Sequence, residues 1–471
     1  MGYTHCVVCK SQLLAKISAK NILALKGVNQ MAVISISNFS CIKDATLTLS
    51  PVIVLIGPQG SGKSVTTKLS YFFNDILRSH VAFAERGETL ESFKRQLGKQ
   101  FRDWFPPSAW GRERFNINYT NGEFTVRVLR RLRDGKQSDE LAISFSDWFE
   151  VFYKLSLNAF NRHRPQGQND LIVTGSEISD PLEIIWRVRE NIYKSIGSNL
   201  NGDFIQTQTF IPAGRASYTS IGRIVAGLEN IGTFDPIGIR FAKLFATLRE
   251  RSGLFASRSR FHRLHPDVSS RHFQFMKRLI GGEIVQEDEA EYVKTEDGRK
   301  IPFSALSSGQ QELLPMWALI DYFAQMDHLR VKNSRKAMEV LYIEEPEAHL
   351  FPSAQSLFLE FLLGSLRGSN SVTRSIILTT HSPYIMGRLN VFLKAGQLSR
   401  RKKRNTDINA VVPRECWLSN EDFAAYAIED GKLRSIVDEE DGLIDASYLD
   451  GISHDIENDF DRLLKIEAEI R

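Results

Sequence analysis

A glycine-rich loop between an apolar strand and a helix constrains this chain more than any other feature. Val52–Ile56 is an uninterrupted apolar run, and Val65–Leu77 has a helical pattern. The loop between them has the form G-x-x-x-x-G-K-S, with the residues Gly57, Pro58, Gln59, Gly60, Ser61, Gly62, Lys63 and Ser64. Such glycines let backbone N–H groups point into a concave anion nest, and the helix N-terminus adds a positive dipole end. The sequence therefore predicts that residues 57–65 hold the phosphates of a nucleoside triphosphate.

Two side chains at the end of this loop carry separate roles. We expect Lys63 to reach the β- and γ-phosphates and the Ser64 hydroxyl to ligate Mg²⁺. The alternative is a chance glycine-rich turn before a helix. Because strand, loop, lysine and helix all occur together, the sequence favours the nucleotide site, with ATP and Mg²⁺ as the expected ligands.

The composition is that of an ordinary soluble globular chain with two or three structural units. The chain has 471 residues, of which 25% are charged and 42% hydrophobic, and its net charge of +4 neither requires nor excludes a nucleic-acid partner. No apolar run is long enough to span a bilayer, and with only four cysteines we expect a cytoplasmic protein with no membrane partner. Cys6 and Cys9 form a lone C-x-x-C pair, which favours an unstructured extension over a zinc site.

Short strands alternate with helical stretches along the chain, which predicts a largely parallel α/β sheet with inserted hairpins. Strands are expected at 32–36, 45–49, 204–212, 340–343 and 375–380. Hairpins are expected at 114–129, turning at Asn121-Gly122, and at 283–301, turning at Asp297-Gly298. Helical patterns cover 80–113, 146–200, 217–277 and 312–326.

Two adjacent carboxylates follow the apolar strand Val340–Ile343. Ligand sites in parallel sheets lie at the carboxyl ends of the strands, and successive strand residues point opposite ways. Glu344 is therefore placed to hold Mg²⁺ through water, and Glu345 to orient or deprotonate the attacking water. The alternative is a pair of solvated carboxylates with no function. The glycine-rich loop at 57–64, a P-loop motif, argues against this alternative.

The run Leu306-Ser307-Ser308-Gly309-Gln310-Gln311 opens a helix just before that strand. With the preceding P-loop and the following acidic strand, it resembles the ABC ATPase family, whose signature has the form L-S-G-G-Q; Ser308 replaces the first glycine. The resemblance implies that residues 307–310 of one protomer complete the nucleotide site of another. The expected assembly is therefore a homodimer or a higher homo-oligomer formed through the nucleotide interface. It also implies that His381, which follows the strand at 375–380, contacts the γ-phosphate as a switch histidine.

The branch of this family is indicated by further motifs. Residues 34–39 and 42–45 resemble the first strands of SMC, RecF and OLD-type ATPases, and the runs E-P-E-A-H-L-F-P and T-H-S-P resemble the OLD and RecF branch. Residues 307–315 also look like ATPases from anti-phage systems such as Septu and PARIS. The resemblance implies a P-loop ABC-type head with a mainly parallel sheet, an antiparallel hairpin subdomain and a helical insertion. No heptad run supplies a coiled-coil arm, and the residues after His381 are too few for a Toprim nuclease domain.

These features divide the chain into five expected segments. They are an unstructured extension (1–30), the first part of the head with the P-loop (31–80), an inserted hairpin and helical region (81–280), the second part of the head (281–390), and a C-terminal element packing on the head (391–471). A glutamine that helps to hold Mg²⁺ in transporter-type ATPases has two candidates, Gln206 and Gln208, and the sequence does not choose between them.

Three functions follow from different readings of the same residues. The first is an ATP-driven switch that acts with a separate effector, such as a nuclease or toxin, in anti-phage defence. The second is a DNA-binding clamp in recombination or repair, supported by basic residues near 127–133, 258–272 and 400–404. The third, a transporter's ATPase subunit, is disfavoured by the N-terminal strands and the E-E-P-E-A-H-L run.

Overall fold

We describe a computed structural model of the chain, which covers residues 32–133, 136–163, 181–200, 204–219, 235–250, 266–287, 290–329, 337–367, 372–401, 405–445 and 458–464. The expected N-terminal extension with Cys6 and Cys9 lies outside the described residues. So does most of the basic stretch 258–272, as do residues 402–404.

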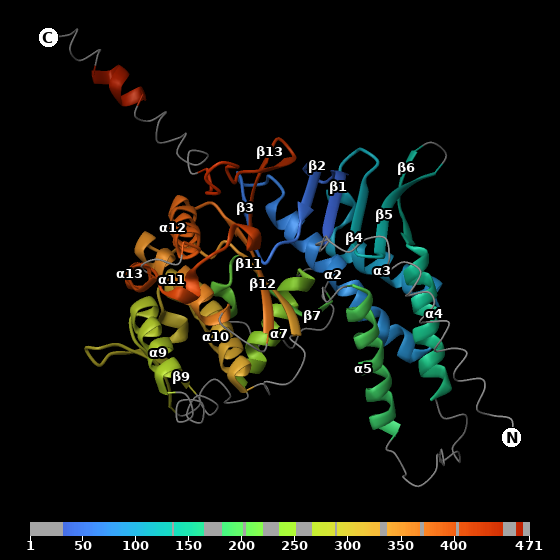
Figure 1. Cartoon of the computed structure of the whole chain (residues 1–471), viewed down its shortest axis with the longest axis horizontal. Helices are drawn as coiled ribbons and strands as arrows, with labels where there is room; N and C mark the ends of the chain where they lie inside the picture. The colour runs from blue at the N-terminus through green and yellow to red at the C-terminus, as the bar shows by residue number, and fades with distance from the viewer. Residues whose placement is uncertain are drawn as a thin grey trace.

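Within these residues one eleven-stranded mixed sheet runs through the molecule, in the order β6-β5-β4-β1-β2-β14-β13-β3-β12-β11-β7 (Figure 1). Its strands are β1 (Val33–Phe39), β2 (Ile42–Thr48), β3 (Val52–Ile56), β4 (Asn116–Asn121), β5 (Phe124–Arg133), β6 (Lys136–Phe145), β7 (Ile205–Ile211), β11 (Ala337–Glu344), β12 (Val372–Thr380), β13 (Phe423–Glu429) and β14 (Lys432–Ser435). The expected α/β class and the hairpin turning at Asn121-Gly122 are confirmed.

The sheet has a parallel half and an antiparallel half. The strands β13, β3, β12, β11 and β7 pair in parallel, whereas β1, β2, β4, β5 and β6 pair as antiparallel neighbours. Every residue of β3 is fully buried, which explains its unbroken apolar run, since a parallel strand covered on both faces needs no alternation. The carboxyl ends of β3, β12 and β11 therefore share one edge of the sheet.

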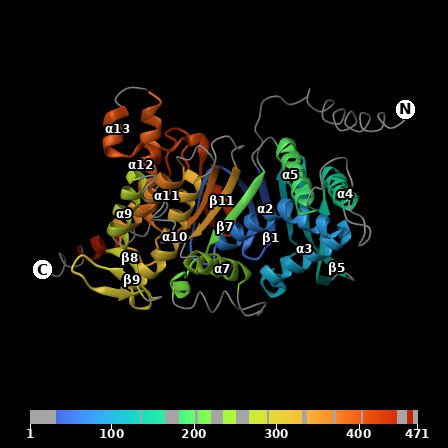
Figure 2. The same ribbon diagram turned by 90° about the horizontal axis from the view of Figure 1, so that it is seen from below.

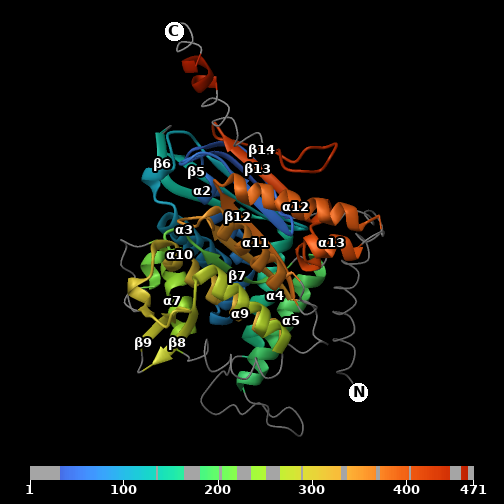
Figure 3. The same ribbon diagram turned by 90° about the vertical axis from the view of Figure 1, so that its left-hand side faces the viewer.

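Helices cover both faces of this sheet (Figures 2 and 3). Ile53 and Leu55 point into one apolar core, and Val52, Val54 and Ile56 point into the other, as the two-residue period of a strand requires. The first core contains residues of α2 (Lys63–Arg86), α3 (Leu90–Trp104), α4 (Asp147–Arg162) and α5 (Pro181–Asn199). The second contains residues of α7 (Pro236–Glu250), α9 (Pro266–Ile280), α10 (Ser308–Leu329), α11 (Pro352–Leu366) and α12 (Pro383–Ser399).

The structure differs from the expected elements in three places. The hairpin expected at 283–301 is a three-stranded sheet of β8 (Glu283–Glu287), β9 (Ala290–Lys294) and β10 (Lys300–Pro302), because the chain turns twice. The strand β6 was not expected, since its sequence K-Q-S-D-E-L-A-I-S-F begins with polar residues. The C-terminal β13 and β14 enter the main sheet between β3 and β2. None of the described helices has the length and apolar character that crossing a membrane requires.

The fully buried His80 on α2 makes the first core sensitive to acid. Burial lowers the pKa of His80 from 6.5 to about 4, and its ring contacts Leu77 O and Ser156 Oγ. Between these values the unfolded chain binds a proton that the folded chain does not, so stability falls as the pH drops from 6.5 to 4. On acidification from neutral pH to about pH 4, the free energy of unfolding should fall by roughly 2–3 kcal/mol less in His80→Gln than in the parent protein. Urea unfolding of both proteins at the two pH values measures this difference. An equal decrease in the free energy of unfolding of the parent and of His80→Gln would contradict this prediction.

Candidate nucleotide-binding site

The P-loop joins β3 to α2 and packs against residues of two other strands, β13 and β2. A Cβ atom at Gly57 would lie 2.5 Å from the carbonyl oxygen of Ile428 in β13. At Gly62, where φ is 111°, a Cβ atom would lie 2.9 Å from Cγ1 of Ile42. Both positions therefore require glycine because neighbouring backbone and side chains occupy the space.

Lys63 is buried inside this loop. Its Nζ donates hydrogen bonds to Gly57 O at 2.7 Å and Pro58 O at 2.8 Å, and burial lowers its pKa. Ser61 Oγ is buried and has no hydrogen-bond partner within the described structure. A cation whose hydrogen bonds within the described residues go to carbonyl oxygens, beside an unpartnered hydroxyl, fits a loop that can receive an anion.

Glu344 lies at the end of β11 beside the first turns of α2. Only 5% of its surface is exposed, and its Oε1 is 3.5 Å from Thr67 Oγ1. Its Oε2 accepts a hydrogen bond from the Ala213 N–H at 3.3 Å. No group of three or more metal-ligating side chains occurs in the described part of the chain. The Ser64 hydroxyl and one buried carboxylate fit Mg²⁺, which proteins bind through few side chains together with substrate phosphates.

The structure brings Glu345 and His381 together at the same edge. His381 Nε2 lies 3.6 Å from Glu345 Oε1, and both side chains are about one-third exposed, at 31% and 39%. Glu345 has φ of 43°, and its N–H donates to Thr379 O at 3.0 Å. The His381 N–H donates to Glu347 Oε1 at 2.5 Å. A left-handed, non-glycine backbone at this point is a strained conformation held by its neighbours.

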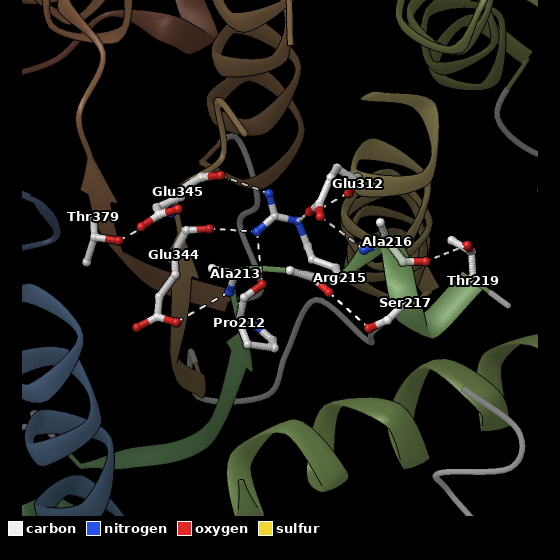
Figure 4. A network of polar contacts seen from close by, with 11 residues as sticks. Pro212, Ala213, Arg215, Ala216, Ser217, Thr219, Glu312, Glu344, Glu345 and Thr379 are labelled. Atoms are coloured by element: carbon white, nitrogen blue, oxygen red, sulfur yellow. Dashed lines mark hydrogen bonds and ion pairs between the residues drawn. The ribbon is translucent and has the colours of Figure 1, made fainter. Parts of the chain in front are cut away.

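Arg215 was not identified from the sequence, yet it lies at the centre of the polar network in Figure 4. Its guanidinium is completely buried and donates to three backbone oxygens at the carboxyl ends of β7 and β11: Pro212 O at 2.9 Å, Glu344 O at 2.6 Å and Glu345 O at 2.9 Å. Burial lowers the pKa of Arg215. One side chain thus connects the end of β7 with the acidic turn.

The same arginine also reaches the helix that begins at the signature. Arg215 Nε donates to Glu312 O at 3.1 Å and lies 3.3 Å from Glu312 Oε2, while Glu312 Oε1 accepts the Ala216 N–H (Figure 4). Glu312 is in the second turn of α10. The only sequence signal for Arg215 is an arginine shortly after a predicted strand, which many surface arginines share.

The signature residues begin α10 as a reciprocal cap. The Ser307 N–H donates to Gln310 Oε1 at 3.0 Å, and the Gln310 N–H donates to Ser307 Oγ at 3.4 Å. Ser307 and Ser308 are exposed, and Gln310 Nε2 donates to Ile280 O at 2.7 Å. A Cβ atom at Gly309 would lie 2.6 Å from His349 O, so this glycine allows α10 to approach the turn after β11.

The two candidate glutamines lie away from the acidic edge. Gln208 Nε2 donates to Tyr71 O at 2.8 Å, and Gln208 pairs in register with Val340, in the middle of β11. Gln206 precedes it on β7 and is exposed. The group of this segment that reaches Glu344 is the Ala213 N–H.

Residues 242–386 match the family model described as the AAA ATPase domain. This range includes the start of α10, Glu344, Glu345 and His381, whereas the P-loop precedes it. The match indicates an ATPase domain.

Distant structural likenesses are to SMC heads. One is an SMC head bound to the C-winged helix domain of ScpA, which is 11% identical in sequence and has a TM-score of 0.36. The match covers 86% of the present chain and 96% of that SMC head. The SMC head from Thermotoga maritima has 13% identity, 86% and 97% coverage, and a TM-score of 0.32. An Smc head from Pyrococcus furiosus has 11% identity, 94% and 100% coverage, and a TM-score of 0.33. No curated protein matches the chain.

Proposed function

We propose that this chain hydrolyses ATP at the P-loop and acts as a nucleotide-driven switch between copies of itself. The parallel pairing of β3, β12 and β11 carries this proposal, because it places the P-loop, His381 and the two carboxylates at one edge of the sheet. A phosphate nest, a buried carboxylate and an exposed carboxylate beside a histidine are the parts that phosphoryl transfer to water needs.

In this mechanism the side chains divide the work. Lys63 exchanges its two loop carbonyls for the β- and γ-phosphate oxygens, which give it stronger, charge-assisted hydrogen bonds. Ser64 and Glu344 would hold Mg²⁺, which would supply positive charge against the phosphates. Glu345 orients the attacking water and accepts its proton, and His381 contacts the γ-phosphate and positions Glu345. The left-handed turn at Glu345 presents its carboxylate to solvent, where the water enters.

Exposed groups around this edge support completion of the site by a second copy of the chain. Ser307 and Ser308 stand exposed at the start of α10, where helix N–H groups attract anions. Two large apolar side chains flank the catalytic turns: Phe351 is 76% exposed and Tyr384 is 55% exposed. Burial of these side chains against a partner would stabilise a face-to-face dimer around ATP.

The Arg215 network supports a coupling between this interface and the chemistry. One buried guanidinium binds both α10 and the backbone of Glu344 and Glu345. A displacement of α10 when a partner's nucleotide binds at residues 307–310 is therefore transmitted to the catalytic turn through a single side chain. We propose that the switch acts on a separate effector, such as a nuclease or toxin of an anti-phage system, which the resemblance of residues 307–315 supports.

The two-chain site predicts complementation between two inactive variants. Ser308→Arg places a long cation in the closed interface, and Lys63→Ala removes the main phosphate contact, so each should lose ATP hydrolysis alone. When the two variants are mixed, they can form a mixed dimer. One of its two sites combines the intact P-loop of the Ser308→Arg chain with the intact residues 307–310 of the Lys63→Ala chain. Partial ATP hydrolysis should therefore return in the mixture. The arginine introduced at position 308 then faces the other site, whose P-loop lacks Lys63 and holds no nucleotide. The measurement is phosphate release by each variant and by the mixture.

Glu296→Arg, an exposed position in the turn between β9 and β10, is the matched control and should keep the parent rate. Ser308→Arg should still bind ATP, and ATP-dependent association should be lost on size exclusion. Normal hydrolysis by Ser308→Arg as a dilute monomer would show that residues 307–310 only cap the helix. Hydrolysis by neither the parent protein nor the mixture would contradict the ATPase itself.

A further inference from the structure

A cavity of about 1070 Å³ lies among α9, α11, α13 (Asn405–Val411) and the segment after α13. These helices gather at one side of the molecule, away from α2 (Figures 1 and 2). Nothing in the proposed nucleotide site uses this cavity. Its volume is slightly larger than that of most small-molecule sites, which measure about 300–1,000 Å³.

Four arginines line the cavity, and they come from three separate elements. Arg271 and Arg278 lie seven positions apart on α9, Arg367 follows the end of α11, and Arg414 follows α13. Seven positions are close to two helical turns, so the two α9 arginines lie on one face. The convergence of these charges is a product of the tertiary fold.

The carboxylates of the cavity do not neutralise all four arginines. Glu415 pairs with Arg271 at 2.8 Å, and Glu360 pairs with Arg388, outside the lining, at 3.0 Å. Within the described residues, the guanidiniums of Arg278 and Arg414 have no hydrogen-bonding or ion-pair partner. Two exposed guanidinium forks therefore stand beside a cavity whose own carboxylates are already engaged.

We propose that this cavity binds a phosphate-bearing ligand of the nucleotide class, separate from the ATP at the P-loop. Arginine forks match phosphate oxygens in a bidentate geometry, which lysine cannot reproduce. The same cavity is lined by the neutral polar side chains of Gln274, Asn405, Thr406 and Asn409. Such groups contact sugars, phosphates and base edges.

An aromatic wall favours a nucleotide over a plain acidic chain. Trp417 lines the cavity, and its indole N–H donates to Val412 O at 2.9 Å, which fixes the ring. A base can stack on a fixed indole, whereas an aspartate or glutamate side chain of an acidic peptide cannot. The proposal does not depend on hydrolysis at the P-loop.

The cavity is also connected to the signature. Arg278 lies two residues before Ile280, whose carbonyl accepts the Gln310 Nε2 hydrogen bond of the cap. Helix α11 begins directly after the turn that carries Glu345. A ligand held between α9 and α11 would therefore touch two elements that end at the nucleotide site.

The test is direct binding of a fluorescent, 5′-hydroxyl oligothymidylate by anisotropy in low salt, because an oligonucleotide without terminal phosphates has no triphosphate for the P-loop. Arg278→Glu and Arg414→Glu should each weaken binding about tenfold or more. Arg187→Glu, an exposed arginine of α5, changes the net charge equally and should weaken binding less than twofold. Thermal unfolding of the variants verifies that each is folded.

Competition distinguishes the sources of the phosphate. Displacement by adenosine monophosphate identifies a free nucleotide as the ligand, and displacement only by longer single strands identifies a nucleic-acid backbone. Either outcome of the competition supports the proposal. Lys63→Ala should bind the oligothymidylate as tightly as the parent protein does, whether or not the parent hydrolyses ATP. Equal binding by the parent and both pocket variants would overturn it. So would failure of every phosphate probe to bind, or preferential binding of a poly-glutamate peptide.

Discussion

Replacement of Glu345 by glutamine should stop ATP turnover while leaving ATP bound. The amide keeps the shape of the side chain but cannot accept a proton from the attacking water, so the rate should fall by about a hundredfold or more. The backbone of this position is held by Thr379 and Arg215 through main-chain atoms, which the substitution does not change. We therefore expect a correctly folded protein that accumulates as an ATP-bound, higher-mass assembly.

Single-turnover hydrolysis and size exclusion with ATP measure the two halves of this result. Glu344→Gln should behave differently, because loss of the buried carboxylate weakens Mg²⁺ binding and can be offset by higher Mg²⁺ concentration. Glu421→Gln, an exposed position whose partner is Arg400, should retain the parent rate. Turnover at the parent rate in Glu345→Gln would remove Glu345 from its assigned role.

Arg215→Met should reduce both stability and turnover, and the second effect should exceed what unfolding explains. The substitution leaves the buried Glu312 without its cation and frees the Glu344 and Glu345 carbonyls, so we expect a loss of about 3–5 kcal/mol in unfolding free energy. In the fraction that remains folded, kcat should fall more than tenfold, because Glu345 loses its fixed position. ATP affinity should change little, since no P-loop contact is altered.

A second buried arginine at the opposite end of the same strands provides the matched control. Arg374 of β12 pairs with Asp327 at 2.8 Å and Glu339 at 2.6 Å, and it is also buried, with 6% of its surface exposed. Arg374→Met should cost similar stability but leave kcat of the folded fraction unchanged, because these contacts lie at the amino ends of β11 and β12. Equal losses of kcat in both variants would show that Arg215 acts only through stability.

The contrast between Lys63 and Arg215 shows which kind of residue the sequence can reveal. Lys63 belongs to a contiguous motif whose spacing carries its function, since the loop and the helix start are local structures. Arg215 takes its partners from positions 212, 312, 344 and 345, and no local pattern joins them. The arginines of the cavity are likewise brought together from α9, α11 and the segment after α13.

By itself, the sequence determined the local elements whose physics is short-ranged. The unbroken apolar runs specified β3, β11 and β12 as buried strands, the Asn121-Gly122 pair specified a hairpin, and the Ser307-to-Gln310 spacing specified a helix start. The contiguous motifs also selected the residues for the proposed phosphate and acid–base roles. The predictions of these strands, this hairpin and this helix start succeed because propensity, turn geometry and burial periodicity act over a few residues.

Only the tertiary structure decided which of these elements are neighbours. The sheet order places C-terminal β13 against β3, so that Ile428 shapes the P-loop at Gly57, and it seats the end of β7 beside Glu344. It also buries Arg215 and gathers the cavity arginines. Such arrangements depend on long-range strand pairing and on the partners available to a buried charge. Those are properties of the whole packed chain, which no window of sequence contains.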